Sequence, residues 1–599
     1  MTIFDALAML GGLALFLYGM HIMGEGLSRA SGGRLEALLE RLTSNRIKAV
    51  LVGCGVTAII QSSSATTVMV VGLVNSGIMK LSQAVGIIMG ANIGTTATSW
   101  LLSLASIEGT NFFIQLLKPS NFAPILAVIG VIFIMFSKSD KKKDAALILV
   151  GFAILMTGME NMSEAVEPLK DVPEFTNILT MFSNPFLGLL AGALLTAIIQ
   201  SSSASVGILQ ALCSTGAIGF STALPIIMGQ NIGTCVTAMI SSVGGSKNAR
   251  RTALVHLYFN LIGTVIFMIV FYALNAVFRF PFMEGAIDAK GIATIHTTFN
   301  VFATVVLLPF GKFLEKLAYL SVPEDKNSEV QSEIDKNLGM LDVRFLDTPG
   351  YAISMAKNVT VKMAETMHES IKLAMGLVKE YNDEIGRTVV ALEEDVDRYE
   401  DELDSYLLKI SSRDLSEKES HDVTVLQHCI NDFERIADHA INIKESSEEK
   451  HSRGMEFSDK AARELEIFSS AIYEILDLTM DMFVTEDIKK ARHVEPLEEV
   501  IDDLSVEMKA RHISRLRKGK CTIELGFILQ DITTSYERVA DHCSNIAIYM
   551  MQEDYVDIDT HEFMENIKNS GDIDFEGQKM YYRNKYMLPE TNVNKEAVK

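Results

Sequence analysis

The chain has 599 residues, of which 48% are hydrophobic, and its formal net charge is −22. The charges are unevenly placed, because residues 1–320 carry only 19 of the 53 Lys+Arg and 15 of the 75 Asp+Glu. A weakly basic apolar part therefore precedes a strongly acidic part, and this balance argues against a nucleic-acid partner.

The first eighty residues contain one segment that can cross a membrane and two that are too short. Residues 4–24 are long enough for ~30 Å of hydrocarbon, and the amphipathic residues 25–46 are expected to lie along the interface. Residues 47–60 and 65–76 are too short to cross, and they meet at Gln61-Ser62-Ser63-Ser64. We predict a re-entrant hairpin whose tip is covered by protein, because irregular backbone is not tolerated in lipid.

The segments that follow are longer. Residues 83–106 are long enough to cross, but Gly90–Gly94 interrupts them, so a broken helix is predicted. Residues 121–137 and 144–160 are predicted to cross again, and the basic loop at Lys141–Lys143 separates them. Basic loops favour the cytoplasmic side of a membrane, so this loop provides a reference for the topology.

The hairpin and the interrupted helix both occur twice. Thr57–Thr66 recurs as Thr196–Ser205, with nine of ten positions identical at an offset of 139. Gly90–Thr95 recurs as Gly229–Thr234 at the same offset. Polar residues are costly in lipid, and polar positions duplicated in register favour a functional role over helix packing alone.

The second copy predicts the same plan further along the chain. It gives a hairpin over about 186–216 and a broken helix over about 221–244, followed by crossings at about 252–278 and 291–311. With the lysine loop inside, about seven full crossings put the N-terminus outside and the C-terminus in the cytoplasm. About three crossings separate equivalent points, so the second copy is predicted to be inverted, which is typical of secondary transporters.

The predicted fold class is all-α. It is a polytopic membrane transporter with two inverted repeats, each with a re-entrant hairpin and a broken helix, followed by a soluble helical bundle. The predicted boundaries are 1–320 for the membrane domain, with repeats at about 4–106 and 144–244 and extra helices to 311, then 321–345 for a linker, 346–552 for the bundle and 553–599 for an acidic tail.

The chemistry of the duplicated segments predicts an anion site and a cation site. A hairpin tip leaves backbone N–H groups free at a helix start, and the serine and glutamine side chains add donors for an oxyanion. The predicted substrate-binding residues are Gln61, Ser62, Ser63, Ser64, Gln200, Ser201, Ser202 and Ser203. Carbonyl, amide and hydroxyl oxygens at the broken helices suit a hard cation such as Na⁺. The predicted sodium-binding residues are Thr66, Asn92, Thr95, Ser205, Asn231 and Thr234.

These paired Gln-Ser-Ser-Ser-Ala and Gly-x-Asn-Ile-Gly-Thr segments resemble the sodium/phosphate cotransporter family, type II and its bacterial relatives. The resemblance covers about residues 1–320 and implies inorganic phosphate as the substrate and Na⁺ as the coupling ion. His256 and His296, each in a His-x-x-Phe-Asn segment, also resemble family positions, although helix packing is an alternative explanation for both.

The acidic part has helical periodicity and a duplication of its own. Glu434–Ile443 recurs as Glu537–Ile546 at an offset of 103. Carboxylates four residues apart lie on one face of a helix, which favours metal binding, with a solvated acidic face as the alternative. The predicted metal-binding residues are Glu393, Asp397, Glu434, Asp438, Glu498, Asp502, Glu537 and Asp541.

This part resembles the PhoU family of phosphate-response regulators. The resemblance implies a divalent metal or an iron cluster, and a regulatory rather than catalytic role for residues 346–552. The tail segment Lys585–Pro589 also fits transporter-fused members of that family.

The predicted function is therefore sodium-dependent transport of inorganic phosphate across the cell membrane by alternating access, with a cytoplasmic PhoU-like regulatory domain. Two alternatives stay open: phosphate export, and a phosphate-sensing receptor that signals to a partner through the PhoU-like domain. Membrane lipid is an expected partner, and a homodimer is compatible with the sequence. An intramembrane serine enzyme is disfavoured, because a nucleophile needs one partnered serine and both copies carry the serines equally.

Overall fold

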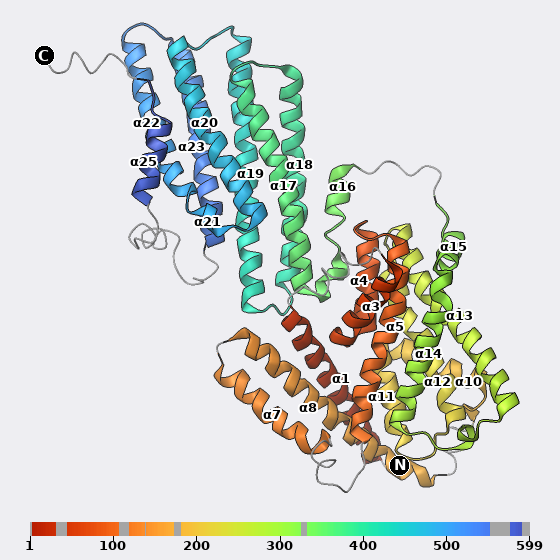
Figure 1. The fold of residues 1–599 in the computed structure, drawn as a ribbon. Coiled ribbons are helices and arrows are strands. Elements are labelled where there is room, and N and C mark those ends of the chain that lie inside the picture. Colours follow the sequence, from red (N-terminus) through yellow and green to blue (C-terminus); the bar gives the residue numbers. More distant parts are fainter. Residues whose placement is uncertain are drawn as a thin grey trace. The chain divides into compact units, whose positions relative to one another are not determined.

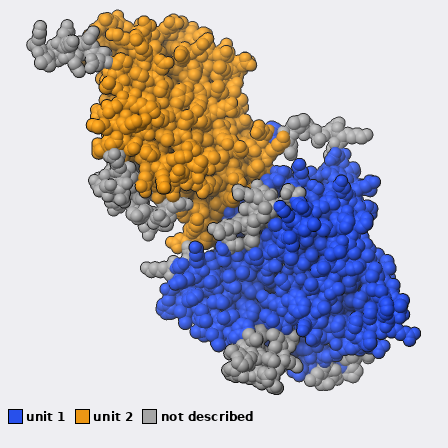
Figure 2. Space-filling view, in the orientation of Figure 1, with its two compact units in different colours: residues 1–332, 342–352 blue, residues 333–341, 353–599 orange. Residues whose placement is uncertain are grey.

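The computed structural model is all-helical in the residues that it describes, which confirms the all-α part of the predicted fold class. The described residues are 3–31, 45–106, 119–137, 139–172, 181–324, 332–551 and 575–589. Their only β-type pairing is one isolated bridge between Gly219 and Ala286. The chain divides into two compact units, Met1–Ser332 with Asp342–Ala352, and Glu333–Leu341 with Ile353–Lys599 (Figures 1 and 2).

The first unit consists of apolar helices. They are α1 (Ile3–Ser31), α3 (Arg46–Ile60), α4 (Ser63–Asn75), α5 (Leu81–Ser103), α7 (Pro119–Phe136), α8 (Asp140–Val166), α10 (Pro185–Ile199), α11 (Ser202–Cys213), α12 (Phe220–Ser241), α13 (Lys247–Phe278), α14 (Ala289–Leu307) and α15 (Gly311–Ser321). Among the described residues, six stretches are long and apolar enough to cross a membrane, within α1, α5, α8, α12, α13 and α14 with α15. The predicted crossing at 121–137 corresponds to α7, whose apolar stretch Asn121–Phe136 is shorter than these six.

Both predicted hairpins are pairs of short helices. In the first copy, Gln61 caps the end of α3 and Ser62 caps the start of α4. In the second copy, Gln200 caps the end of α10 and Ser201 caps the start of α11. The N-terminal segment differs from its prediction, since α1 continues to Ser31 instead of ending near residue 24. Residues 32–44 of the predicted interfacial stretch lie outside the described residues.

The prediction of a broken helix is wrong for both copies, because α5 and α12 are continuous. Their glycines admit a neighbouring helix: an added Cβ at Gly90 would lie 2.0 Å from the Val50 carbonyl oxygen of α3. One at Gly229 would lie 2.0 Å from the Leu189 carbonyl oxygen of α10. Carbonyls inside a continuous helix already accept backbone hydrogen bonds, so the exposed carbonyls expected as Na⁺ ligands are not present there.

Helices α1 and α8 are equivalent in the two copies, and they pack side by side (Figure 1). An added Cβ at Gly19 would lie 2.3 Å from the Leu155 nitrogen, and one at Gly158 would lie 2.3 Å from the Phe16 nitrogen. Phe16 and Leu155 are themselves separated by the repeat offset, so the contact is the same seen from either helix. Residue numbers fall along α8 as they rise along α1, which makes the two equivalent helices antiparallel.

The acidic part is a bundle of helices, most of them long. They are α16 (Glu333–Leu338), α17 (Pro349–Leu377), α18 (Asp383–Ser411), α19 (Glu417–Ser452), α20 (Asp459–Thr485), α21 (Ile488–Ala491), α22 (Val494–Arg517), α23 (Ile523–Met551) and α25 (Phe575–Lys585). Helices α19 and α23, which carry the duplicated motif, pack against each other. Buried aromatic rings fill the bundle, including Phe433 packed edge-on against Phe483 at 5.0 Å.

Candidate functional site

The two hairpin tips have the same local geometry. Gln61 ends α3 with φ 60° and Gln200 ends α10 with φ 56°, so both glutamines adopt the left-handed helical backbone conformation. That conformation is uncommon outside glycine and is often found where function requires it. The next serine caps the following helix, because Ser62 Oγ accepts from Ala65 N at 3.1 Å and Ser201 Oγ accepts from Ala204 N at 3.2 Å.

Each tip therefore presents the start of a helix with serines around it. The first N–H groups of a helix have no partner within the helix, and the helix dipole makes this end positive. Ser63 and Ser202 are the first residues of their helices, and both are buried. The structure places all eight predicted substrate-binding residues at these two tips, in an arrangement that can accept an oxyanion.

The two copies differ in how their polar side chains are bonded. In the first copy, Thr57 Oγ1 donates to Thr66 Oγ1 at 3.0 Å. The equivalent atoms in the second copy, Thr196 Oγ1 and Ser205 Oγ, are buried and have no hydrogen-bond partner among the described residues. Buried polar atoms are nearly always bonded, so an unpaired set of this kind indicates a site for a bound ligand, ion or water.

The same difference recurs beside the tips. Thr98 Oγ1 of α5 donates to Gln61 Oε1 at 2.9 Å, which ties the first tip to its own repeat. The equivalent hydroxyl in the second copy, Thr237 Oγ1, is buried without a partner in the part of the chain that the structure describes. The first tip is thus closed by its own side chains, whereas the second retains free hydroxyl oxygens.

The predicted sodium-binding residues of α5 and α12 lie in buried positions but are not equivalent. Asn92 Nδ2 donates to the Ile88 carbonyl at 2.8 Å, and Asn231 Nδ2 donates to the Ile227 carbonyl at 3.1 Å. Asn231 Oδ1 is also bonded to His296 Nε2 at 3.3 Å. The described residues give Asn92 Oδ1 no such partner, so its oxygen is the more available of the two.

His296 joins the two repeats, a contact that the sequence does not predict. The Asn231 amide nitrogen donates to the Ile227 carbonyl, so the amide oxygen faces the histidine and can only accept from Nε2–H. The other ring nitrogen, Nδ1, then carries no proton and accepts from Ser99 Oγ at 2.7 Å. Gln210 of α11 continues this line, with its amide nitrogen 3.0 Å from the Ser99 carbonyl oxygen. The isolated Gln210 in an apolar helix was the available sequence signal. His256, by contrast, has both ring nitrogens buried without a partner among the described residues.

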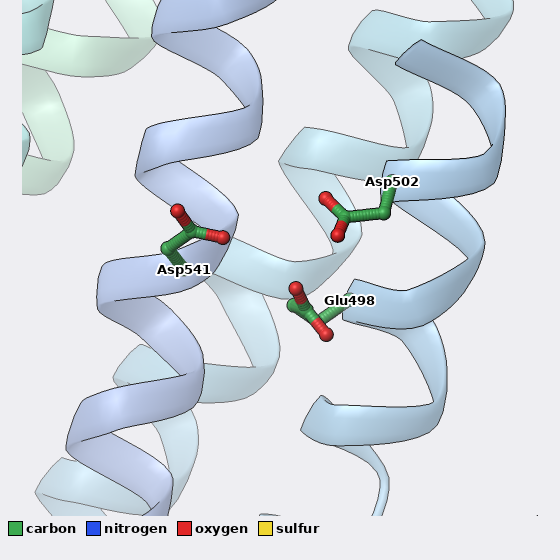
Figure 3. Close-up of side chains that lie close together, drawn as sticks. All are labelled: Glu498, Asp502 and Asp541. Atoms are coloured by element: carbon green, nitrogen blue, oxygen red, sulfur yellow. The ribbon is translucent and has the colours of Figure 1, made fainter. Parts of the chain in front are cut away.

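A second candidate site lies in the acidic part. Glu498 and Asp502 of α22 face Asp541 of α23, and ligand atoms of the three carboxylates lie within 4.8 Å of one another (Figure 3). Burial first, then the neighbouring Glu495 and Asp502, raises the pKa of Glu498 to about 8. Burial and Asp541 raise the pKa of Asp502 to about 6. Crowded carboxylates of this kind can hold a divalent cation, which would cancel their repulsion.

The remaining predicted metal ligands are placed differently. Glu537 accepts hydrogen bonds from Lys509 at 2.9 Å and Ser505 at 2.7 Å, and these outweigh burial and lower its pKa. In the first half of the bundle, the four predicted ligands Glu393, Asp397, Glu434 and Asp438 lie on α18 and α19 but do not meet as closely. Burial, then Asp438, still raises the pKa of Glu434 to about 7. Glu495, beside Glu498, is an acidic neighbour that the motif does not reveal.

Comparison with known proteins gives the duplicated tips a context. The model of the Na⁺/Pi-cotransporter family matches residues 15–164 and again residues 156–289. The chain belongs to the Na⁺/Pi-cotransporter family. The PhoU domain model matches the acidic part of the chain twice, at residues 360–446 and 465–550. The protein is therefore a membrane protein of a phosphate-transporter family with two fused PhoU domains.

Individual relatives match different parts of the chain. Escherichia coli YjbB, which is named as a proposed inorganic phosphate export protein, is 26% identical over 535 residues, 86% of this chain and 91% of its own. Bacillus subtilis YqeW, named as uncharacterized, is 30% identical over 312 residues, 52% of this chain and 96% of its own. Human sodium-dependent phosphate transport protein 2B is 34% identical over 131 residues, 20% and 19% of the two chains. No solved structure matches the chain.

Proposed function

We propose that the protein is a sodium-coupled transporter of inorganic phosphate that binds its substrate at the paired hairpin tips. The observation that carries this proposal is the duplicated geometry of a left-handed glutamine followed by a serine-capped helix start at Gln61 and Gln200. One helix start contributes only ~0.3–1 kcal/mol to anion binding, and up to ~2 when partly buried. Serine and glutamine donors to a charged oxyanion add roughly 1.5–3 kcal/mol each, which makes the complete tip a competent phosphate site.

The coupling cation is proposed to bind beside the tips. The unpaired oxygens of Thr196 and Ser205 in the second copy, and Asn92 Oδ1 in the first, are the neutral hard ligands that Na⁺ prefers. The name of the human relative, a sodium-dependent phosphate transport protein, agrees with this chemistry. The bonded pair Thr57 and Thr66 would have to separate before serving as ligands, so we rank the second copy first.

Alternating access is proposed to arise from two inverted repeats. The antiparallel packing of α1 on α8 supports this arrangement, because those helices are equivalent in the two copies. We place the N-terminus outside and the PhoU-like domain in the cytoplasm, on the basis of the basic loop at Lys141–Lys143. The name of YjbB favours export as the physiological direction. Moving each unit of net charge through 100 mV is worth ~2.3 kcal/mol, so an inside-negative potential favours efflux when the phosphate carries more charge than the Na⁺ that crosses with it.

The PhoU-like domain is proposed to bind a divalent metal and to regulate transport. The three convergent carboxylates Glu498, Asp502 and Asp541 support this proposal, because their crowding disfavours the ionised forms and a bound cation would offset that cost. Oxygen-only ligands favour a hard divalent ion such as Mn²⁺ or Mg²⁺.

The test is radiolabelled phosphate flux in proteoliposomes of the full chain. A Na⁺ gradient should drive flux in both directions according to its sign, whereas an equal K⁺ gradient should not. Replacing Ser201, Ser202 and Ser203 by alanine should abolish flux, and Ser214→Ala, at the far end of the same hairpin arm, should not. Saturable phosphate binding with no flux under either gradient would instead support the receptor alternative.

The sodium site has its own matched pair of variants. Thr196→Ala with Ser205→Ala removes two unpaired hydroxyls and should raise the Na⁺ concentration for half-maximal flux at least tenfold. The equivalent Thr57→Ala with Thr66→Ala removes a hydroxyl pair that is already bonded, and should change it less. An equal or opposite effect of the two pairs would refute the ranking of the second copy.

A further inference from the structure

Residues 342–352 span the end of the predicted linker and the first turn of α17, yet they belong to the first compact unit. We call these residues the latch. The short helical turn Val343–Asp347 packs against α4, the outgoing arm of the first hairpin. Its Phe345 is fully buried, and Leu346 is 5% exposed. The latch is therefore a docked segment of the membrane unit and not a solvated connection.

Polar contacts fix the latch at the last residue of α4. Asn75 Nδ2 donates to Asp342 Oδ2 at 2.8 Å, while Asn75 Oδ1 accepts from Ser246 N, at the start of α13, at 2.7 Å. Asp342 is in turn bonded to Arg344, whose Nε lies 2.7 Å from Asp342 Oδ1. The nitrogen and the oxygen of one half-buried amide are thus used to join the latch, α4 and α13.

An apolar contact lies one turn earlier along α4. The Phe345 ring lies directly on Gly72, where an added Cβ would be 2.6 Å from the ring carbon Cε1. Tyr351 packs edge-on against the same ring, with centroids 4.9 Å apart. Only glycine at position 72 leaves room for the ring in this position.

The second copy of the hairpin lacks these features, although the two hairpins share their tips. The residue equivalent to Gly72 is Ala211, whose methyl group would occupy the place of the ring. The residue equivalent to Asn75 is Ser214, which bonds to the Ala211 carbonyl of its own helix at 2.7 Å. The first copy is thus adapted at the two positions that meet the latch.

The position of the latch gives it leverage on the candidate phosphate site. Helix α4 begins at Ser63, in the tip, and ends at Asn75, in the latch contact. Its 13 residues span roughly 20 Å, and a single helix moves as a rigid element. A segment that holds one end of α4 therefore restrains the tip at the other end.

We propose that the latch couples the PhoU-like domain to transport: docked, it restrains α4 and slows exchange between transport states, and released, it lets the hairpin move. The latch includes the first turn of α17, so a change in the PhoU-like helices can pull on it. Coupling of this kind is reciprocal, so movement of the hairpin also alters latch docking. This regulatory role rests on the proposed transport function, because the tip matters to flux only if phosphate binds there.

Docking can be measured without transport. In the full chain, Leu346→Cys should react slowly with a maleimide, because position 346 is buried while the latch is docked. Adding Gly72→Ala should speed the reaction at least tenfold. Gly55→Ala is the matched control, because it lies on α3 of the same hairpin with nothing within 4 Å of the added methyl. Fast labelling of Leu346→Cys without a second change would overturn the docked latch.

Flux then tests the coupling. Gly72→Ala and Phe345→Ala should each raise phosphate flux at least threefold, and together no further, because they release the same contact. Gly55→Ala should leave flux unchanged. Faster maleimide labelling in Gly72→Ala with unchanged phosphate flux would overturn the regulatory role while leaving phosphate transport intact. Slow labelling with no flux in either the wild type or Gly72→Ala would instead overturn the proposed transport function, and the regulatory role with it.

Discussion

The acidic cluster makes a quantitative prediction about protons. Glu498 has a pKa of about 8 and Asp502 of about 6, so at pH 7 they hold about 0.9 and about 0.1 proton. A bound divalent cation requires both carboxylates ionised, so Mn²⁺ should release ~1 proton at pH 7. The release should approach ~2 at pH 5 and fall to ~0.1 at pH 9. The affinity should therefore rise with pH, by roughly tenfold per unit near neutrality.

The assay is isothermal titration of the full chain with Mn²⁺ in two buffers of different ionisation enthalpy. The difference in heat divided by the difference in ionisation enthalpy gives the protons released. Glu498→Gln should remove this proton-releasing component, because Glu498 holds most of the proton at pH 7. Asp503→Asn, an exposed neighbour on the same helix, should retain it. Equal heats in the two buffers at pH 7, or Mn²⁺ binding that survives Glu498→Gln unchanged, would refute the reasoning.

Three further predictions concern stability. When a chelator keeps metal away, the raised pKa values of Glu498 and Asp502 contribute stability that is fully present below about pH 4. This stability is lost as the pH rises through about 6 and about 8, so the Tm of the PhoU-like domain should fall between about pH 4 and pH 8. Gly90→Ala should prevent monodisperse purification because of its 2.0 Å backbone clash, whereas Gly55→Ala should behave as wild type in size-exclusion chromatography. Glu464→Gln strips a buried partner from two arginines, Arg511 at 3.1 Å and Arg515 at 2.5 Å. It should cost about 3–5 kcal/mol in denaturant unfolding, against little for the exposed Glu466→Gln.

The sequence predicts the hairpin tips well because their signals are local. A helix that stops at glutamine and restarts at a capping serine is defined by residues next to one another, so Gln61 and Ser62 could be placed from the chain alone. The all-helical fold follows from apolar length and periodicity for the same reason. The duplication then made each local prediction twice.

The sequence fails where a residue's role depends on a distant partner. The sequence predicts that Gly90 breaks its helix, but in the structure its missing side chain leaves room for the Val50 carbonyl oxygen of another helix. Glu537 matches its motif, yet Lys509 from α22 takes it out of the carboxylate cluster. His296 and Asn231 are 65 residues apart, and nothing in their local sequence brings them together. Spacing identifies which residues share a face, and only tertiary packing decides what that face meets.

The crossing of α1 and α8 has a consequence for the origin of the molecule. Gly19 meets Leu155 as Gly158 meets Phe16, so the contact is isologous, with the same patch on both sides. A chain of half the length that carried one such glycine could pair with an upside-down copy of itself through the identical contact. At this crossing the chain has the geometry that such a pair of antiparallel copies would have. Fusion frees each half to diverge, as the hydroxyl pairs at Thr57 and Thr196 already have.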